Sequence, residues 1–208
     1  MRVLTIHGWA FCPEVFKSLP PSLEVEHHSI TYEGSLKEEA KKVAQKIDEN
    51  TILVGWSMGA TIGVLSTRIK TPKGLVLIGA TPHFARAWRP TFIKTFLEEL
   101  ERDFSEKVEE FRKTVWGEEV CKELPPREGA ISFLKEFIET DISPLLENLK
   151  LPTLLVHGRK DPITPYTELR KMLKLNPRFE AITYDGGHFP KGFSQGDWEE
   201  IFNRFGQL

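Results

Sequence analysis

The sequence lacks the long apolar segments that membrane-spanning helices require. No stretch of its 208 residues approaches the ~18–20 uninterrupted apolar residues needed to cross a bilayer. It also lacks an excess of either charge, because 28 Lys and Arg residues stand against 30 Asp and Glu residues, for a formal charge of −2. The composition therefore predicts neither a membrane nor nucleic acid as a partner.

Cysteine is nearly absent. Cys12 and Cys121 are the only two, and they form no CxxC motif and no cluster with His, so we expect free thiols and no metal site. The apolar run at residues 3–6 is too short for a secretory signal, which together with free thiols predicts a cytoplasmic protein. Glutamine is also scarce while Glu and Lys are abundant, a bias typical of thermophilic proteins.

Short β-prone runs alternate with helical segments, which predicts an α/β fold with a mostly parallel sheet of about six strands. The expected strands are Val3–Ile6, Glu24–Tyr32, Thr51–Gly55, Leu75–Ile78, Thr153–His157 and Phe179–Tyr184. Most of these runs are continuously apolar, as expected for strands that are buried on both faces. The expected helices between and after them are Ser35–Asn50, Ala60–Lys70, Pro165–Leu175 and Asp197–Phe205.

The alternation stops in the middle of the chain. Between residues 83 and 144 no strand is predicted, and three amphipathic helices are expected near Pro90–Leu100, Ser105–Trp116 and Arg127–Glu139. An all-helical insertion of this kind commonly forms a lid over a binding site. We therefore predict a core of residues 1–82 and 145–208 with a helical lid of residues 83–144.

The clearest chemical motif is Gly55-Trp56-Ser57-Met58-Gly59, which lies where an apolar strand passes directly into a helix. A serine on such a tight turn needs small neighbours two residues to either side, and the turn lifts its hydroxyl clear of the sheet. The helix N-terminus and the N–H group after the serine can stabilise negative charge there. Ser57 is therefore the candidate nucleophile.

A serine nucleophile needs a base and an orienting carboxylate. His188 follows Asp185-Gly186-Gly187 in the loop after the last expected strand, and Asp161 lies in the loop after the strand before it. The carboxyl ends of parallel strands meet at one edge of a sheet, where ligands bind. The order Ser, Asp, His also fits this architecture, so Asp161 and His188 are the candidate triad partners.

Two backbone N–H groups are candidates for an oxyanion hole. Trp9 follows His7-Gly8 after the first expected strand, and Met58 follows the candidate nucleophile. The Trp9 indole should also form a wall of the pocket. His7 and His157, each at the end of a strand, are interpreted as structural.

With these motifs in place, the chain resembles the α/β-hydrolase superfamily, without its usual first hairpin. Val3–Trp9, the serine motif, Leu75–Pro82 and Asp141–Pro165 are similar to the pimeloyl-[acyl-carrier protein] methyl ester esterases of biotin synthesis. The resemblance implies an esterase without a cofactor that acts on an acyl methyl ester. The substrate-binding residues that it implies are Trp9, Ser57, Met58, Phe111, Val115 and His188.

The sequence does not determine the substrate. The triad suits a small ester or an acyl carrier protein ester, but a thioesterase or a C–C hydrolase would use the same residues, and a non-catalytic binding protein is a further alternative. Acidic residues outnumber basic ones in the insertion, and only Arg86, Arg89 and Lys94 form a candidate basic patch for an acidic carrier protein. A monomer or a small homo-oligomer is expected.

Overall fold

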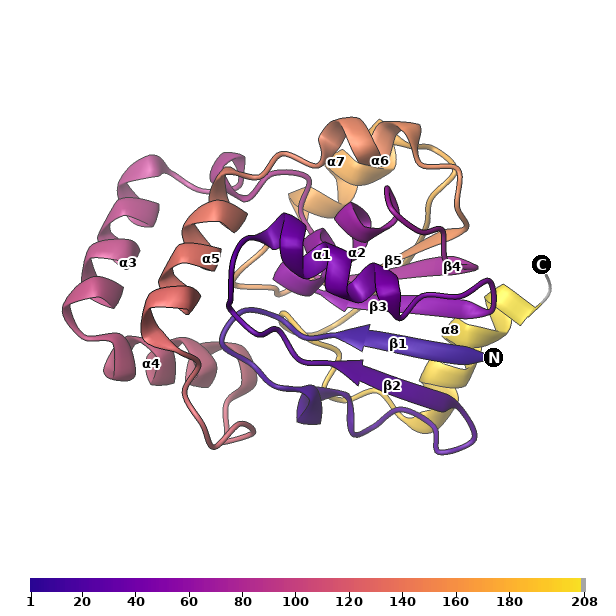
Figure 1. Ribbon diagram of the computed structural model, residues 1–208, viewed down its shortest axis with the longest axis horizontal. Helices are drawn as coiled ribbons and strands as arrows, with labels where there is room; N and C mark the ends of the chain where they lie inside the picture. The colour runs from indigo at the N-terminus through magenta and orange to yellow at the C-terminus, as the bar shows by residue number, and fades with distance from the viewer. Residues whose placement is uncertain (207–208) are drawn as a thin grey trace.

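A computed structural model describes residues 1–206 as a six-stranded sheet with helices on both faces (Figure 1). The strand order is β2-β1-β3-β4-β5-β6, and every neighbouring pair is parallel. The strands are β1 (Arg2–Ile6), β2 (Glu24–His28), β3 (Thr51–Trp56), β4 (Gly74–Ile78), β5 (Thr153–Gly158) and β6 (Glu180–Tyr184). The predicted fold is confirmed, although β2 is shorter than expected.

Residues 1–206 contain eight α-helices, and seven of them follow the predicted pattern with shifts at their ends. They are α1 (Leu36–Gln45), α2 (Met58–Ser66), α3 (Pro90–Arg102), α4 (Phe104–Trp116), α5 (Arg127–Glu139), α6 (Ser143–Asn148), α7 (Thr167–Leu175) and α8 (Gln195–Gly206). Short 3-10 helices occupy Pro13–Phe16 and Phe84–Arg86. The sequence did not predict α6, whose six residues begin with Ser-Pro, because so short a segment carries little periodicity.

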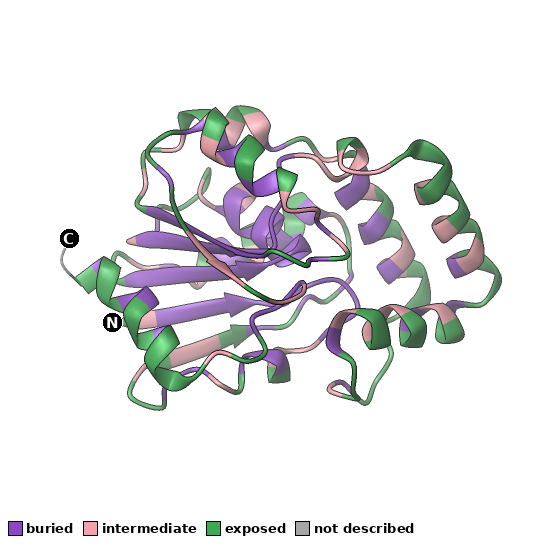
Figure 2. Ribbon diagram, turned by 180° about the vertical axis from the view of Figure 1, so that it is seen from behind, coloured by how far each residue is buried: buried purple, intermediate pink, exposed green. Residues whose placement is uncertain are grey.

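The sheet has two buried faces because successive side chains of a strand point to opposite sides. On β1, Leu4 joins the apolar cluster formed with α1, α2 and α7, whereas Val3 joins the cluster formed with α8. On β3, Leu53 joins the first of these clusters and Val54 joins the second. Figure 2 shows the central strands buried between helices with exposed outer faces. This two-sided burial explains why these strands are continuously apolar in sequence.

The helices α3, α4 and α5 stand beyond the carboxyl ends of the strands, toward which the arrowheads point in Figure 1. We call them the cap. Their apolar stripes pack on one another and on the core, as Leu100, Val108 and Phe133 do in the cluster that also contains β1 and β3 residues. The division of the chain at residues 83 and 144 stays a prediction; α6 crosses the second boundary.

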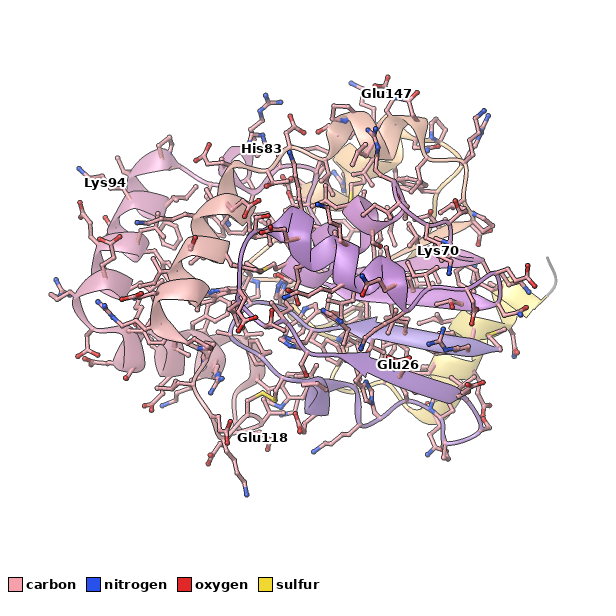
Figure 3. All side chains as sticks on the ribbon, in the orientation of Figure 1. Glu26, Lys70, His83, Lys94, Glu118 and Glu147 are labelled. Atoms are coloured by element: carbon pink, nitrogen blue, oxygen red, sulfur yellow. A yellow bond between two sulfur atoms is a disulfide. The ribbon has the colours of Figure 1, made fainter. Side chains whose placement is uncertain are left out.

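The prediction of free thiols is wrong, because Cys12 and Cys121 form a disulfide with Cα atoms 5.8 Å apart (Figure 3, yellow bond near Glu118). Their separation of 109 residues hides the pairing from the sequence. The fold brings the loop after β1 against the loop between α4 and α5, well within the distance that a disulfide spans. Because the two cysteines are paired, they no longer favour a cytoplasmic location, and that location stays a prediction.

Among residues 1–206, no helix combines the length and the apolarity that crossing a bilayer requires.

The disulfide predicts a measurable loss of stability when it is removed. In the chain-entropy estimate, a closed loop of roughly 100 residues contributes about 4–5 kcal/mol, because the crosslink restricts the unfolded chain. We expect the Cys12→Ser/Cys121→Ser variant to lose stability of that order in urea unfolding. Thiol titration of the unreduced, denatured wild type should find no free thiol, and an unreduced protein with reactive thiols would contradict the pairing.

Candidate active site

Ser57 occupies a strained turn between β3 and α2. Its φ of 56° and ψ of −119° are unusual for a residue with a side chain, and such strain commonly accumulates at functional sites. The Ser57 N–H donates to the Ile78 carbonyl at 2.9 Å, which fixes the turn to the end of β4. Ser57 is 8% exposed, and it lines a cavity described below.

The two glycines of the motif are required by close backbone contacts. A Cβ atom on Gly55 would lie 2.5 Å from the Gly59 carbonyl oxygen and 2.6 Å from the Ala60 Cα atom. A Cβ atom on Gly59 would collide with the carbonyl oxygens of Ile6 and His7. The glycines therefore let the turn close and let α2 approach the end of β1, as the sequence argument expected.

His188 and Asp161 form a buried hydrogen-bonded pair. The His188 Nδ1 atom lies 2.7 Å from Asp161 Oδ2, and the two side chains are 1% and 0% exposed. Burial alone would raise the Asp161 pKa, but the nearby His188 charge and hydrogen bonds from His188 and two backbone N–H groups hold the pKa below its ordinary value. His188 Nε2 is buried and has no hydrogen-bond partner among residues 1–206.

Thr164 and Trp56 support this pair, and sequence reasoning missed both. The Thr164 hydroxyl lies 2.8 Å from Asp161 Oδ2, and the backbone N–H of Thr164 donates to Asp161 Oδ1 at 2.9 Å. The Trp56 indole donates to the His188 carbonyl oxygen at 3.0 Å, so the residue before Ser57 holds the loop that carries His188. Neither role follows from spacing, although Thr164 three residues after an aspartate fits an Asx-type turn.

The N–H groups of Trp9 and Met58 are free at the same edge of the sheet. Met58 is the first residue of α2, where N–H groups have no partner within the helix. Neither N–H donates to another group among residues 1–206. The Gly8 backbone lies directly against Ser57, because a Cβ atom on Gly8 would lie 3.3 Å from the Ser57 Cβ atom. Both N–H groups thus lie near Ser57 without an acceptor from the described part of the chain, and their place in an oxyanion hole stays a prediction.

His7 fixes the peptide that carries the Trp9 N–H. Its Nδ1 lies 2.8 Å from the Gly8 carbonyl oxygen, and its Nε2 accepts from the Ile30 N–H at 3.0 Å. Since one ring nitrogen donates and the other accepts, the imidazole must be neutral. Burial lowers the His7 pKa to about 4, consistent with that requirement. A carbonyl held on one side of a peptide leaves the N–H pointing to the other side.

A cavity of about 280 Å³ lies between the cap and the sheet edge. Its wall is largely aromatic or aliphatic, and includes Trp9, Phe84, Trp88, Phe96, Phe111 and Phe137. The Trp9 ring meets Phe111 edge to face with centroids 5.1 Å apart, and its indole donates to the Ala130 carbonyl of α5 at 2.8 Å. Sequence reasoning missed most of this wall, because it assembles from separate cap helices.

Val115 is not among the residues that line this cavity, and its predicted place in an acyl pocket stays a prediction. The cavity face of α4 consists of Lys107, Glu110, Phe111 and Thr114. Val115 follows Thr114 about 100° further round the helix, and it packs instead in the cluster that contains Trp116. Met58 and His188, also predicted to bind substrate, are buried and absent from the cavity wall.

The predicted basic patch is partly neutralised. Arg86 lies 3.6 Å from Asp141, and Lys94, at the outer end of the cap in Figure 3, lies 3.6 Å from Glu98. Asp141 is far from Arg86 along the chain, so the sequence does not reveal this pair. Among residues 1–206, no group of three or more His, Cys, Asp or Glu side chains is placed to hold a metal ion.

The neutral state of His7 predicts a pH dependence of stability. A histidine in the unfolded chain has a pKa near 6.5, whereas His7 in the folded chain binds a proton only near pH 4. The contribution of neutral His7 to the free energy of unfolding is therefore present above pH ~6.5 and is lost as the pH falls toward 4. The loss should reach about 2–3 kcal/mol near pH ~4.5, since one pKa unit is worth about 1.4 kcal/mol.

Urea unfolding at neutral pH and near pH ~4.5 measures this loss, with His7→Gln as the non-titrating control. The wild type should lose about 2–3 kcal/mol more than the variant. Equal losses in the two proteins would show that His7 is not held neutral.

Comparison with known proteins finds similar sequences and similar structures. The family described as "alpha/beta hydrolase fold" matches residues 108–194. The pimeloyl-[acyl-carrier protein] methyl ester esterase of Vibrio cholerae serotype O1 is 24% identical over 225 residues, covering 90% of this chain and 87% of that protein.

Two solved structures match along the whole chain. A hydrolase from Oleispira antarctica has a TM-score of 0.83 at 15% identity, covering 100% of this chain and 91% of its own. A bromoperoxidase from Bacillus anthracis has a TM-score of 0.82 at 19% identity, covering 100% and 92%. These findings confirm the resemblance seen in the sequence: the chain has the α/β-hydrolase fold and is similar to the pimeloyl-[acyl-carrier protein] methyl ester esterases.

Proposed function

We propose that this α/β-hydrolase is a serine carboxylic-ester hydrolase with the triad Ser57, His188 and Asp161. The observation that carries the proposal is the strained Ser57 turn in the wall of an apolar cavity. The buried His188–Asp161 pair, fastened to the residue before Ser57, supplies the base that a serine nucleophile needs.

Each residue has one role in the proposed reaction. His188 Nε2 takes the proton from Ser57 Oγ as that oxygen attacks the ester carbonyl, and Asp161 stabilises the imidazolium that forms. The developing oxyanion accepts hydrogen bonds from the Trp9 and Met58 N–H groups. Collapse of the tetrahedral intermediate breaks the C–O bond, and the leaving alcohol receives the proton from His188. Water, deprotonated by His188, then releases the acid from Ser57.

The cavity favours an uncharged acyl chain of moderate length. Its volume of about 280 Å³ is close to the lower end of the range for small-molecule sites, roughly 300–1,000 Å³. The cation in its wall, Lys107, lies 2.6 Å from Glu99 and 2.7 Å from Glu110, so its charge is already compensated. The site therefore suits a neutral ester better than the anionic acid that hydrolysis produces.

The name of the similar Vibrio protein points to a methyl ester of an acyl chain on a carrier protein, and we propose the same class for this chain. The cavity agrees with the acyl part of that substrate. The basic patch of Arg86, Arg89 and Lys94 gives the carrier only weak support, because two of its members are paired with carboxylates. A thioester would use the same triad, and the substrate comparison below distinguishes it.

A serine-directed phosphonate tests the nucleophile. We expect one phosphonate on each wild-type molecule, located by mass spectrometry on the peptide that carries Ser57, and none on Ser57→Ala. The wild type should hydrolyse p-nitrophenyl and methyl esters of medium chain length faster than matched thioesters, and Ser57→Ala should lose this activity. Labelling at another residue, or ester hydrolysis that survives in Ser57→Ala, would overturn the proposed function.

A further inference from the structure

The loop that carries the Trp9 N–H contains a strained residue. Ala10 has a φ of 61°, in the left-handed region that residues with a Cβ atom avoid, and its side chain is fully buried. Such a conformation is unfavourable for a residue with a Cβ atom and persists only where surrounding groups enforce it. The groups that enforce it here are therefore candidates for a role in shaping the oxyanion hole.

Tyr32 holds one side of Ala10. The Ala10 N–H donates to the Tyr32 hydroxyl oxygen at 2.8 Å, and this bond is buried. Tyr32 lies in the loop between β2 and α1, and its ring packs edge to face on Phe133 of the cap at 5.4 Å between centroids. The peptide between Trp9 and Ala10 is thus fixed by a side chain that the cap itself supports.

Arg112 of cap helix α4 holds the other side of Ala10. Its Nε donates to the Ala10 carbonyl oxygen at 2.6 Å. The remaining guanidinium nitrogens donate to the carbonyl oxygens of Cys121 at 2.9 Å and Glu123 at 2.8 Å. The planar fork of arginine therefore joins the loop after β1 to the cap loop with fixed geometry, and lysine could not reproduce it.

We propose that Tyr32 and Arg112 are positioning residues that clamp Ala10 in its left-handed conformation and thereby hold the Trp9 N–H in the oxyanion hole. This inference rests on the proposed function. His7 fixes the peptide between Gly8 and Trp9, and Tyr32 fixes the peptide between Trp9 and Ala10. Arg112 fixes the peptide that follows Ala10. Three consecutive peptides are fixed in this way, and the last anchor belongs to the cap. The cap thus contributes to oxyanion stabilisation as well as to the cavity wall.

Arg112→Met and Tyr32→Phe test the clamp, because each removes one anchor and leaves Ser57, His188 and Asp161 intact. Loss of an oxyanion donor costs about 10²–10³ in kcat in other hydrolases, so a misplaced donor should cost about tenfold or more. KM for a p-nitrophenyl ester should change by less than about threefold, since the hole binds the transition state rather than the ground state.

The inhibition constant of a trifluoromethyl ketone distinguishes a positioning role of Tyr32 and Arg112 from a merely structural one. The ketone adds to a serine to form a tetrahedral oxyanion, so its inhibition constant should rise in each variant by the factor by which kcat/KM falls. A straight-chain alcohol that fills only the cavity should bind with unchanged affinity. Arg127→Met is the matched control, because Arg127 donates to the Glu101 carbonyl within the cap, and it should match the wild type.

The outcomes separate this inference from the proposed function. If the wild type hydrolyses esters and both clamp variants equal it in kcat and in ketone affinity, the clamp is wrong and the triad stands. Equal losses of ketone and alcohol affinity would show general disruption of the site and also overturn the clamp. A wild type that neither hydrolyses esters nor binds the ketone would overturn both proposals.

Discussion

The parallel alignment of the strands is the constraint on which the site depends. Because β1, β3, β5 and β6 all run in one direction, the loops that follow them meet at a single edge of the sheet. Those loops carry Trp9, Ser57, Asp161 and His188. An antiparallel neighbour would send one of these loops to the opposite edge and separate the residues by the length of a strand.

The cap contributes both the cavity wall and the contacts that hold the loop after β1. It covers Ser57 with an aromatic wall, and it reaches the loop after β1 through the Cys12–Cys121 disulfide, the Arg112 guanidinium and the Trp9 indole. A covalent bond, a charge-assisted hydrogen-bond fork and a buried indole hydrogen bond thus converge on a segment of four residues. This concentration of anchors is what a strained residue such as Ala10 requires.

The sequence predicts best those features that are local. The strand-to-helix turn at Ser57 follows from five residues, and the backbone contacts of Gly55 and Gly59 agree with the argument made from their size. Asp161 and His188 follow from their places after strands. Other features join segments that are distant in sequence, so no spacing of residues predicts them. They are the disulfide, the Arg86–Asp141 pair and the contacts of Tyr32 and Arg112 with Ala10. A helical stripe predicts which residues share a face but not which neighbour that face contacts, so the sequence could not show that Phe111 lines the cavity while Val115 packs in the cluster that contains Trp116.

In the proposed reaction an acyl group resides on Ser57 during turnover, and rapid mixing with a p-nitrophenyl ester tests this most directly. We expect an initial burst of p-nitrophenolate equal in amount to the enzyme, followed by slower steady turnover. Acid-quenched samples should carry the acyl group on the peptide that contains Ser57. A wild type that turns over the ester with the acyl group on another residue, or with no acyl group on Ser57 under conditions that give a burst, would contradict the account.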